Sequence, residues 1–405
     1  MALLLTSLSH PAYAQSPSPP KGGGGESSAG AKPPLAQASN QAQAQTQTLA
    51  PDVLKDIEES KASAQAILFT VKSDGILANF GHSATLGAEL AHKEYGQDFE
   101  LIEESEGDGA LYNRVSHFGR VKAAVGHMLE SSLLENAPYY RRYGIPVLLP
   151  FLDNWETGSL GPNFYQLAPD VPAQARVMAE RTLKAPSRKL SKVVILETDA
   201  EPFKLLADTY VSTLKDPSSL TTGKNKRRPL SSRVKVLRYP LKNISELPAI
   251  LSENKLGPQD IVVLALSNRD ALQAAPYFLE SNFQKAIFLG GNALANRDLA
   301  LAFLSANLNL ELLVPLDLRN TKNPTLNKFV GLYRARNKQD PTWPSVLAYD
   351  AITMAITANS APNGTMYLSD PESEPTGLAG SYLFAKRKVP SELVKVTRDS
   401  SVYYP

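Results

Sequence analysis

Apolar residues recur along this chain in two alternating patterns, which together predict an α/β fold. From about residue 66 onward, short apolar and β-branched runs alternate with longer stretches in which apolar residues recur every three to four positions. The short runs are typical of parallel strands buried on both faces, and the longer stretches of helices that cover a sheet. The expected strands are 66–71, 99–103, 122–125, 146–149, 192–196, 234–237, 261–266, 285–289 and 312–316, and the expected helices are 85–95, 133–143, 173–183, 203–214, 270–281, 325–336 and 345–358. Because one sheet seldom holds so many strands, we expect two doubly wound parallel-sheet lobes.

The N-terminal part of the chain does not follow this pattern. Residues 1–14 form a short apolar stretch that ends in Ala12-Tyr13-Ala14, the small-x-small motif after which signal peptidase cleaves. This motif predicts a signal peptide and export to the periplasm or cell envelope, although no Lys or Arg precedes the apolar stretch. Residues 15–60 are rich in Pro, Gly, Ser and Gln, a composition that predicts a disordered linker.

Charge and composition narrow the possible functions. The 405 residues include 42 Lys and Arg against 40 Asp and Glu, so a net charge of +2 gives no basic field for nucleic acid or an anionic membrane. The absence of cysteine excludes disulfides, thiolate zinc sites and cysteine nucleophiles. The five histidines show no metal-binding spacing, and no GxSxG, HExxH or Walker motif occurs. We therefore expect no metal, no cofactor and no enzymatic activity. The basic run 224–228 predicts an exposed loop, either solvated or bound to an acidic partner.

Several segments, in their order along the chain, carry a family resemblance. They are GAELA at 87–91, YGIPVLLP at 143–150, VPLD at 314–317, AYDA at 348–351 and GLAG at 377–380. This order resembles the type I periplasmic binding proteins that serve branched-chain amino-acid ABC transporters. The resemblance implies two lobes joined by a multi-stranded hinge, a ligand cleft between the lobes, and an ABC permease as partner of a monomeric binding protein.

The same resemblance implies where the chain passes between lobes. Crossings are expected near Ala168, Asp317 and Asn363. Lobe 1 is then formed by 61–167 and 317–363, lobe 2 by 168–316, and the closing segment 364–405 returns to lobe 2.

The resemblance also places a candidate ligand site. Ser131 and Ser132 stand where the family has a serine-rich loop before a helix, and either contact a ligand carboxylate or only cap that helix. Glu130 opposes an incoming carboxylate there. The loop after Pro150 is larger and more polar than in the family, and Trp155 either stacks on a ligand or packs the loop. The expected ligand-binding residues are Ser131, Ser132, Asp153, Asn154, Trp155, Asp199 and Asn292.

Two functions remain open from the sequence. The first is an extracytoplasmic solute-binding protein of an ABC importer, closing its lobes around a small amino-acid-like or amide-like ligand. An amide at Asn292, in place of the acidic residue common in the family, supplies no countercharge for an ammonium group. The alternative is a tethered envelope protein of the same fold that binds another protein as a regulator or sensor without transport.

Overall fold

The computed structural model describes residues 65–107, 117–152, 157–185, 189–220, 229–279, 282–320, 322–361, 364, 366–401 and 404–405. They belong to one compact unit that spans Pro51–Pro405. The signal-peptide and linker predictions and the basic run 224–228 lie outside the described residues. None of the helices in the described ranges is both long enough and apolar enough to cross a bilayer.

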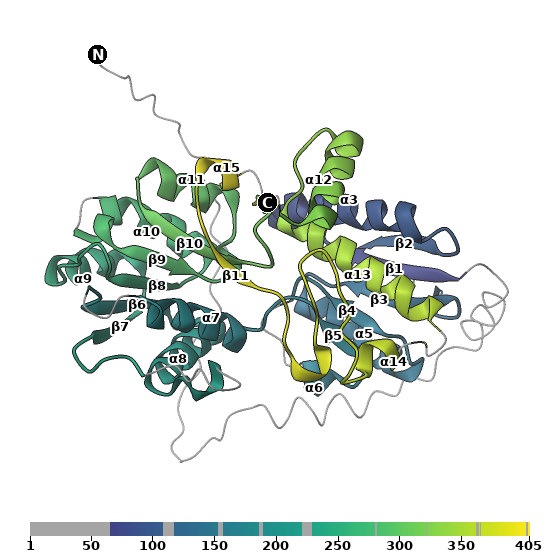
Figure 1. The fold of residues 1–405 in the computed structure, drawn as a ribbon, viewed down its shortest axis with the longest axis horizontal. Coiled ribbons are helices and arrows are strands. Elements are labelled where there is room, and N and C mark those ends of the chain that lie inside the picture. The colour runs from purple at the N-terminus through teal and green to yellow at the C-terminus, as the bar shows by residue number, and fades with distance from the viewer. Residues whose placement is uncertain are drawn as a thin grey trace, which may run out of the picture. The chain divides into compact units, whose positions relative to one another are not determined.

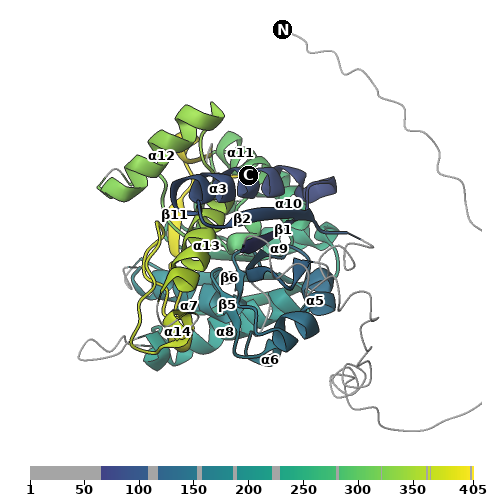
Figure 2. The same ribbon diagram turned by 90° about the vertical axis from the view of Figure 1, so that its right-hand side faces the viewer.

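Lobe 1 is built on a parallel sheet of five strands among the residues described, in the order β2-β1-β3-β4-β5 (Figure 1). A hydrophobic cluster on one face of this sheet includes Phe69, Phe329 and Ile352. Helices α3, α12 and α13 cover that face, and α5 and α6 lie on the other (Figure 2). The strands are β1 Ala66–Val71, β2 Glu100–Ser105, β3 Val121–Gly126, β4 Val147–Leu149 and β5 Phe164–Gln166, and the helices are α3 Ala78–Tyr95, α5 Glu130–Arg142, α6 Thr157–Leu160, α12 Pro324–Asn337 and α13 Trp343–Ser360.

Lobe 2 is built on a second sheet, whose six described strands run in the order β11-β10-β9-β8-β6-β7. All neighbours are parallel except β11, which pairs antiparallel with β10. One hydrophobic cluster packs under α9, α10 and α11, and another under α7 and α8. The strands are β6 Lys192–Thr198, β7 Lys235–Leu241, β8 Ile261–Ala265, β9 Ile287–Gly290, β10 Asn309–Val314 and β11 Glu392–Lys395, and the helices are α7 Val171–Leu183, α8 Glu201–Lys215, α9 Leu247–Glu253, α10 Asn268–Leu279, α11 Arg297–Ser305 and α15 Arg398–Ser401. The short helix α14 Met366–Ser369 belongs to lobe 1, whose hydrophobic cluster contains Leu368.

Polar caps set the starts of helices at the points where the chain changes lobe. The Asp170 carboxylate accepts a hydrogen bond from Ala173 N at 2.6 Å, and Pro172 follows in the first turn of α7. Asn323 accepts from Thr325 N and Leu326 N at 3.1 Å each, directly before Pro324 begins α12. A side-chain oxygen satisfies free N–H groups at a helix start, and proline needs none there. The two crossings expected near Ala168 and Asp317 therefore end in capped helices.

The closing segment differs from its expected place. Leu368, Leu378 and Tyr382 belong to the lobe 1 cluster, so the segment stays on lobe 1 well past residue 363. The buried Asp350 of α13 holds it there, because its carboxylate accepts hydrogen bonds from Leu378 N at 2.6 Å, Ala379 N at 3.1 Å and Tyr382 Oη at 2.9 Å. The chain joins the lobe 2 sheet only at β11. The third crossing thus lies between Val389 and Glu392, and the assignment of all of 364–405 to lobe 2 was wrong.

Candidate functional site

Three polar groups follow the carboxyl ends of neighbouring strands in lobe 2. The register of the sheet pairs Leu196 of β6 with Leu264 of β8, and Leu264 with Gly290 of β9. Thr198 lies two residues after Leu196, and Asn292 lies two residues after Gly290. Asn268 begins the helix that follows β8. Because adjacent strands lie about 4.8 Å apart, these groups share an edge roughly 10 Å wide. Ligands of doubly wound sheets bind outside the carboxyl ends of the strands, so this edge is the candidate binding surface of lobe 2.

The same three side chains each carry a buried atom without a hydrogen-bond partner in the described structure. These atoms are Thr198 Oγ1, Asn268 Oδ1 and Asn292 Oδ1. Leaving a buried polar atom unpaired costs about 1–3 kcal/mol, and only a few such atoms remain in native proteins. A bound molecule that donates hydrogen bonds would remove this cost.

Asn292 is held rigidly at this edge. Only 7% of the residue is exposed, and its main-chain N–H donates to Gln174 Oε1 at 3.0 Å. Gln174 also donates through Nε2 to Pro169 O at 3.0 Å. A Cβ on Gly291 would lie 2.6 Å from Gln174 Oε1, so glycine is required for this contact. Gln174 therefore joins the first lobe crossing to the turn that carries Asn292.

Aromatic side chains of lobe 1 contact lobe 2 beside that turn. Phe80 lies edge-to-face with Phe151 and with Trp343, at centroid distances of 5.3 Å and 4.9 Å. Trp343 is part of a lobe 2 hydrophobic cluster, and Phe80 and Phe151 pack against it. The Trp343 indole donates to Ala295 O at 3.1 Å. Ala295 directly follows the 3-10 turn Asn292–Leu294, so the aromatic cluster and the polar edge are neighbours.

In lobe 1 the corresponding edge carries a buried acid and base. Glu106 follows β2, and its carboxylate accepts from Met128 N at 3.0 Å and Leu129 N at 2.9 Å, directly before α5. His127 Nδ1 lies 3.1 Å from Glu106 Oε1, and both side chains are fully buried. Burial alone would raise the pKa of Glu106, but His127 and the N–H groups of Leu129 and Met128 hold it below its ordinary value.

The residues expected to bind ligand are placed differently from one another. Asp199 is exposed immediately after Thr198, and Asn292 lies at the same sheet edge. Ser131 is exposed in the first turn of α5, whereas Ser132 is buried with its Oγ 3.3 Å from His127 Nδ1. Asp153, Asn154 and Trp155 lie outside the described residues.

Several members of the candidate site were missed from the sequence. Phe80, Phe151 and Trp343 come from separate segments, and only folding brings them together. Glu106 and His127 each follow a strand that the sequence predicted, which is the one local signal that favoured them. No group of three or more His, Cys, Asp or Glu in the described ranges is placed to hold a metal ion.

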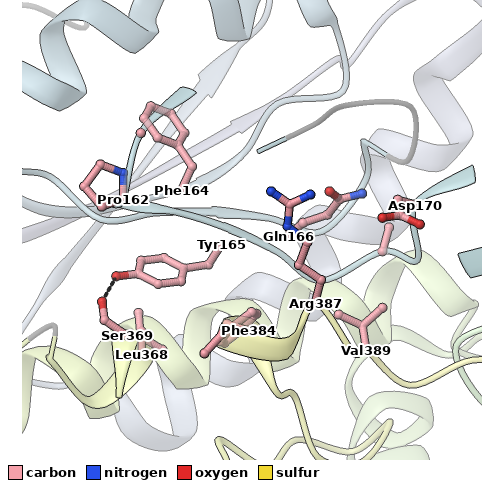
Figure 3. A pocket seen from close by; sticks show the side chains of 13 residues that line it. Pro162, Phe164, Tyr165, Gln166, Asp170, Leu368, Ser369, Phe384, Arg387 and Val389 are labelled. Carbon is pink, nitrogen blue, oxygen red and sulfur yellow. Dashed lines mark hydrogen bonds between the residues drawn. The ribbon is translucent and has the colours of Figure 1, made fainter. Parts of the chain in front are cut away.

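A separate hollow of about 300 Å³ lies at the β5 edge of lobe 1 (Figure 3). Its apolar wall includes Tyr165 and Phe384, whose ring centroids are 5.4 Å apart, and Tyr165 Oη lies 2.6 Å from Ser369 Oγ. Arg387 and Asp170 line its polar end. Of the expected ligand-binding residues that the structure describes, Ser131, Ser132, Asp199 and Asn292, none lines this hollow.

The fold defines a class. Two α/β lobes, each built on a mainly parallel sheet, constitute the type I periplasmic binding protein fold. No protein-family model matches the sequence, and no curated protein matches it by sequence.

Solved structures of this class resemble the chain at low identity. The branched-chain amino-acid substrate-binding protein LivJ from Streptococcus pneumoniae, bound to isoleucine, superposes with a TM-score of 0.61 and 14% identity, covering 82% of this chain and all 100% of that one. A solute-binding protein from R. palustris, bound to 4-hydroxybenzoate, gives 0.62 and 14%, covering 82% and 91%. A fatty acid substrate-binding protein from Thermomonospora curvata gives 0.61 and 13%, covering 85% and 91%. At such identities the likeness concerns the fold.

Proposed function

We propose that this protein is an extracytoplasmic solute-binding protein of an ABC importer, which closes its two lobes by hinge motion around a small polar ligand. The observation that carries the proposal is the set of unpartnered atoms on Thr198, Asn268 and Asn292 at one sheet edge. These atoms lie where this fold class receives its ligands, beside the aromatic residues of the opposite lobe.

The named neighbours support this class of function. The solved structures that resemble the chain include binding components of ABC transporters, one bound to isoleucine, one bound to 4-hydroxybenzoate and one from a fatty acid transporter. Because one fold accepts such different molecules, the ligand of this protein depends on its own side chains. Asp199 and Asn292, together with Thr198 and Asn268, form the lobe 2 half of the proposed site. Asp153, Asn154 and Trp155, which lie outside the described residues, are further proposed members of the site.

The remaining features of the proposal follow from the same class. The protein acts by binding, without a chemical step, as a monomer in the periplasm or cell envelope. An ABC permease in the inner membrane receives its ligand. Hinge closure is the coupling step, because only a closed pair of lobes encloses the ligand on both sides.

A thermal-shift screen of the purified full chain tests this function. Amino acids, short amides, urea-like compounds and small carboxylates are the probes. A ligand at one hundred times its Kd adds about 2.7 kcal/mol to the free energy of unfolding, which raises the Tm measurably. Any hit is then titrated by calorimetry against Asn292→Ala.

A matched pair of asparagines separates binding from folding. Asn292→Ala should weaken ligand binding about tenfold or more and leave the Tm of the free protein nearly unchanged, because its Oδ1 has no partner to lose. Asn254 is equally buried but donates to Tyr239 Oη at 2.9 Å and Ile250 O at 2.8 Å. Asn254→Ala should lower Tm and keep ligand affinity. A screen without any hit would contradict the solute-binding function and favour the alternative, a tethered envelope protein that binds another protein.

A further inference from the structure

The loop between β3 and α5 forms a cradle of main-chain N–H groups that already holds an anion from the chain itself. Gly126 and His127 both have positive φ, +129° and +62°, which turns the following N–H groups of Met128 and Leu129 toward one point. The Glu106 carboxylate accepts from both, at 2.9–3.1 Å. We name this group of residues, Glu106 with 126–129, the anion cradle.

The anion cradle is built rigidly and without solvent. A Cβ on Gly126 would lie 2.0 Å from Thr70 O, so only glycine fits there. The His127 ring is fixed on its other side by Tyr140, whose Oη lies 3.0 Å from Nε2. Lys72 Nζ donates to the main-chain oxygen of Glu106 at 3.0 Å, which fixes the backbone that carries the carboxylate. Neither Glu106 nor His127 exposes its side chain.

The anion cradle faces the same side of lobe 1 as the candidate site. It follows the carboxyl ends of β2 and β3, which flank β1 in the sheet. Phe151 follows the end of β4, next to β3, and it packs against the clusters of both lobes. An incoming carboxylate at this edge therefore meets a cradle that is neutralised and filled.

The lobe 2 edge offers the opposite chemistry. The unpartnered atoms of Asn268 and Asn292 are carbonyl oxygens, which accept hydrogen bonds, and the Thr198 hydroxyl either accepts or donates. Acceptors of this kind are satisfied by N–H groups of a ligand. A neutral amide supplies them without bringing a buried charge that needs a partner.

We propose that Glu106 is a built-in counter-anion that closes the lobe 1 anion cradle, so that this protein recognises a ligand without a carboxylate, a neutral primary amide or urea-type compound that donates N–H groups to Asn268 and Asn292. The ligand class rests on the proposed solute-binding function, whereas the closed cradle is a property of the free protein. The two parts are tested separately.

The cradle is tested with small anions and the full chain. Glu106→Ala opens the cradle and should lower the Tm, and sodium formate or acetate should restore much of that loss in a saturable manner, beyond sodium chloride at equal ionic strength. The wild-type protein should respond to formate and chloride alike. A formate-specific rise in the wild-type Tm overturns the proposal, and this measurement needs no variant, so it decides the matter even if Glu106→Ala does not fold. A folded variant that formate does not rescue overturns it as well.

The ligand class is tested with isosteric pairs. Isobutyramide and isobutyrate, and isovaleramide and isovalerate, are titrated into the wild-type protein by calorimetry. The amide of each pair should bind at least tenfold more tightly than the acid, and Asn292→Ala should abolish that preference. Tighter binding of the acids would refute the ligand class while leaving solute binding intact. If formate rescues the variant but neither the pairs nor the wider screen yields a ligand, the closed cradle stands and the solute-binding function fails.

Discussion

The indole Nε1–H of Trp343 donates a hydrogen bond to the main-chain oxygen of Ala295 at 3.1 Å, and this bond ties the first residue of α13 in lobe 1 to the turn of lobe 2 that carries Asn292. Trp343 is 6% exposed and shares a hydrophobic cluster with Leu294 and Ala295. The contact between the lobes is therefore a specific one, formed by an amphipathic side chain that has both an apolar body and a donor.

Replacement of Trp343 should weaken this contact in two graded steps. Trp343→Phe keeps a ring but loses the donor, and should cost about 1–3 kcal/mol in the free energy of unfolding. Trp343→Ala also empties the site and should cost about 3–5 kcal/mol. Urea denaturation measures both. Tyr277→Phe, at an exposed aromatic, is the control and should change stability by less than about 0.5 kcal/mol. A Trp343→Phe protein as stable as the wild type would contradict the role of the hydrogen bond.

Helices α3 and α13 approach closely at a glycine (Figure 2). A Cβ on Gly87 would lie 2.0 Å from the main-chain oxygen of Ser345, so Gly87→Ala should force the helices apart and cost about 1–3 kcal/mol or more. Gly331 in α12 is the matched control, because it is exposed and no atom lies within 4 Å of its added Cβ. Gly331→Ala should stabilise the protein by up to about 1 kcal/mol. Thermal unfolding of both variants should therefore show shifts of opposite sign, and equal shifts would refute the close approach.

Asp350 should give a distinctive pH dependence. Burial raises its pKa to about 6, against the lowering effect of the hydrogen bonds from Leu378, Ala379 and Tyr382. The folded state then binds the proton more tightly than the unfolded chain does, because the ordinary pKa is 3.8. The contribution of Asp350 to stability is therefore largest below about pH 4 and falls, by roughly 3 kcal/mol in total, as the pH rises to about 6.

The comparison with Asp350→Asn isolates this effect. Denaturation of both proteins between pH 4 and pH 7 should show the wild type losing stability relative to the variant as the pH rises, with no further change above the raised pKa. A relative gain of wild-type stability over this interval would mean that the three hydrogen bonds outweigh the cost of burial.

Glu106 should titrate with the opposite sign. His127 and the N–H groups of Leu129 and Met128 hold its pKa below the ordinary 4.5 in spite of burial. Its contribution is complete above pH 4.5 and is lost as the pH falls below that value, because protonation then favours the unfolded chain.

Substitution of Glu106 checks both the sign and the size of this contribution. Glu106→Gln should cost about 2–4 kcal/mol at neutral pH, since charge-assisted hydrogen bonds in a buried site are lost, and the acid-induced loss of stability should become shallower. Glu103 lies three residues before Glu106 in the sequence and is exposed. Glu103→Gln should therefore leave unchanged both the free energy of unfolding at neutral pH and its loss at acidic pH. An acid limb identical in the wild type and the Glu106→Gln protein would contradict the lowered pKa.

The sequence predicted most of the helices and strands, but it predicted less well where they begin and end and which other segments they pack against. Each of the nine expected strands corresponds to a strand of the structure, and each of the seven expected helices to a helix. Their bounds are shifted by up to seven residues, the difference at the start of α3. Strands β5 and β11 were missed because their sequences, FYQ and ELVK, mix apolar and polar residues, whereas the equally short β4 and β9 are apolar throughout and were predicted. Helices α9 and α11 were also absent from the prediction. The place of the closing segment was wrong because the hydrogen bonds of Asp350 to Leu378 and Tyr382 have no signature in local sequence.

The sequence by itself determined the two-lobed α/β fold, because the spacing of apolar residues is a local property that differs between helices and buried strands. It also placed Asp199 and Asn292 after the ends of the lobe 2 strands. Only the tertiary structure decided that Glu106 fills the cradle of Met128 and Leu129, and that Trp343 reaches Ala295. These contacts join residues more than twenty positions apart, and their hydrogen bonds form only where packing removes water and fixes both partners.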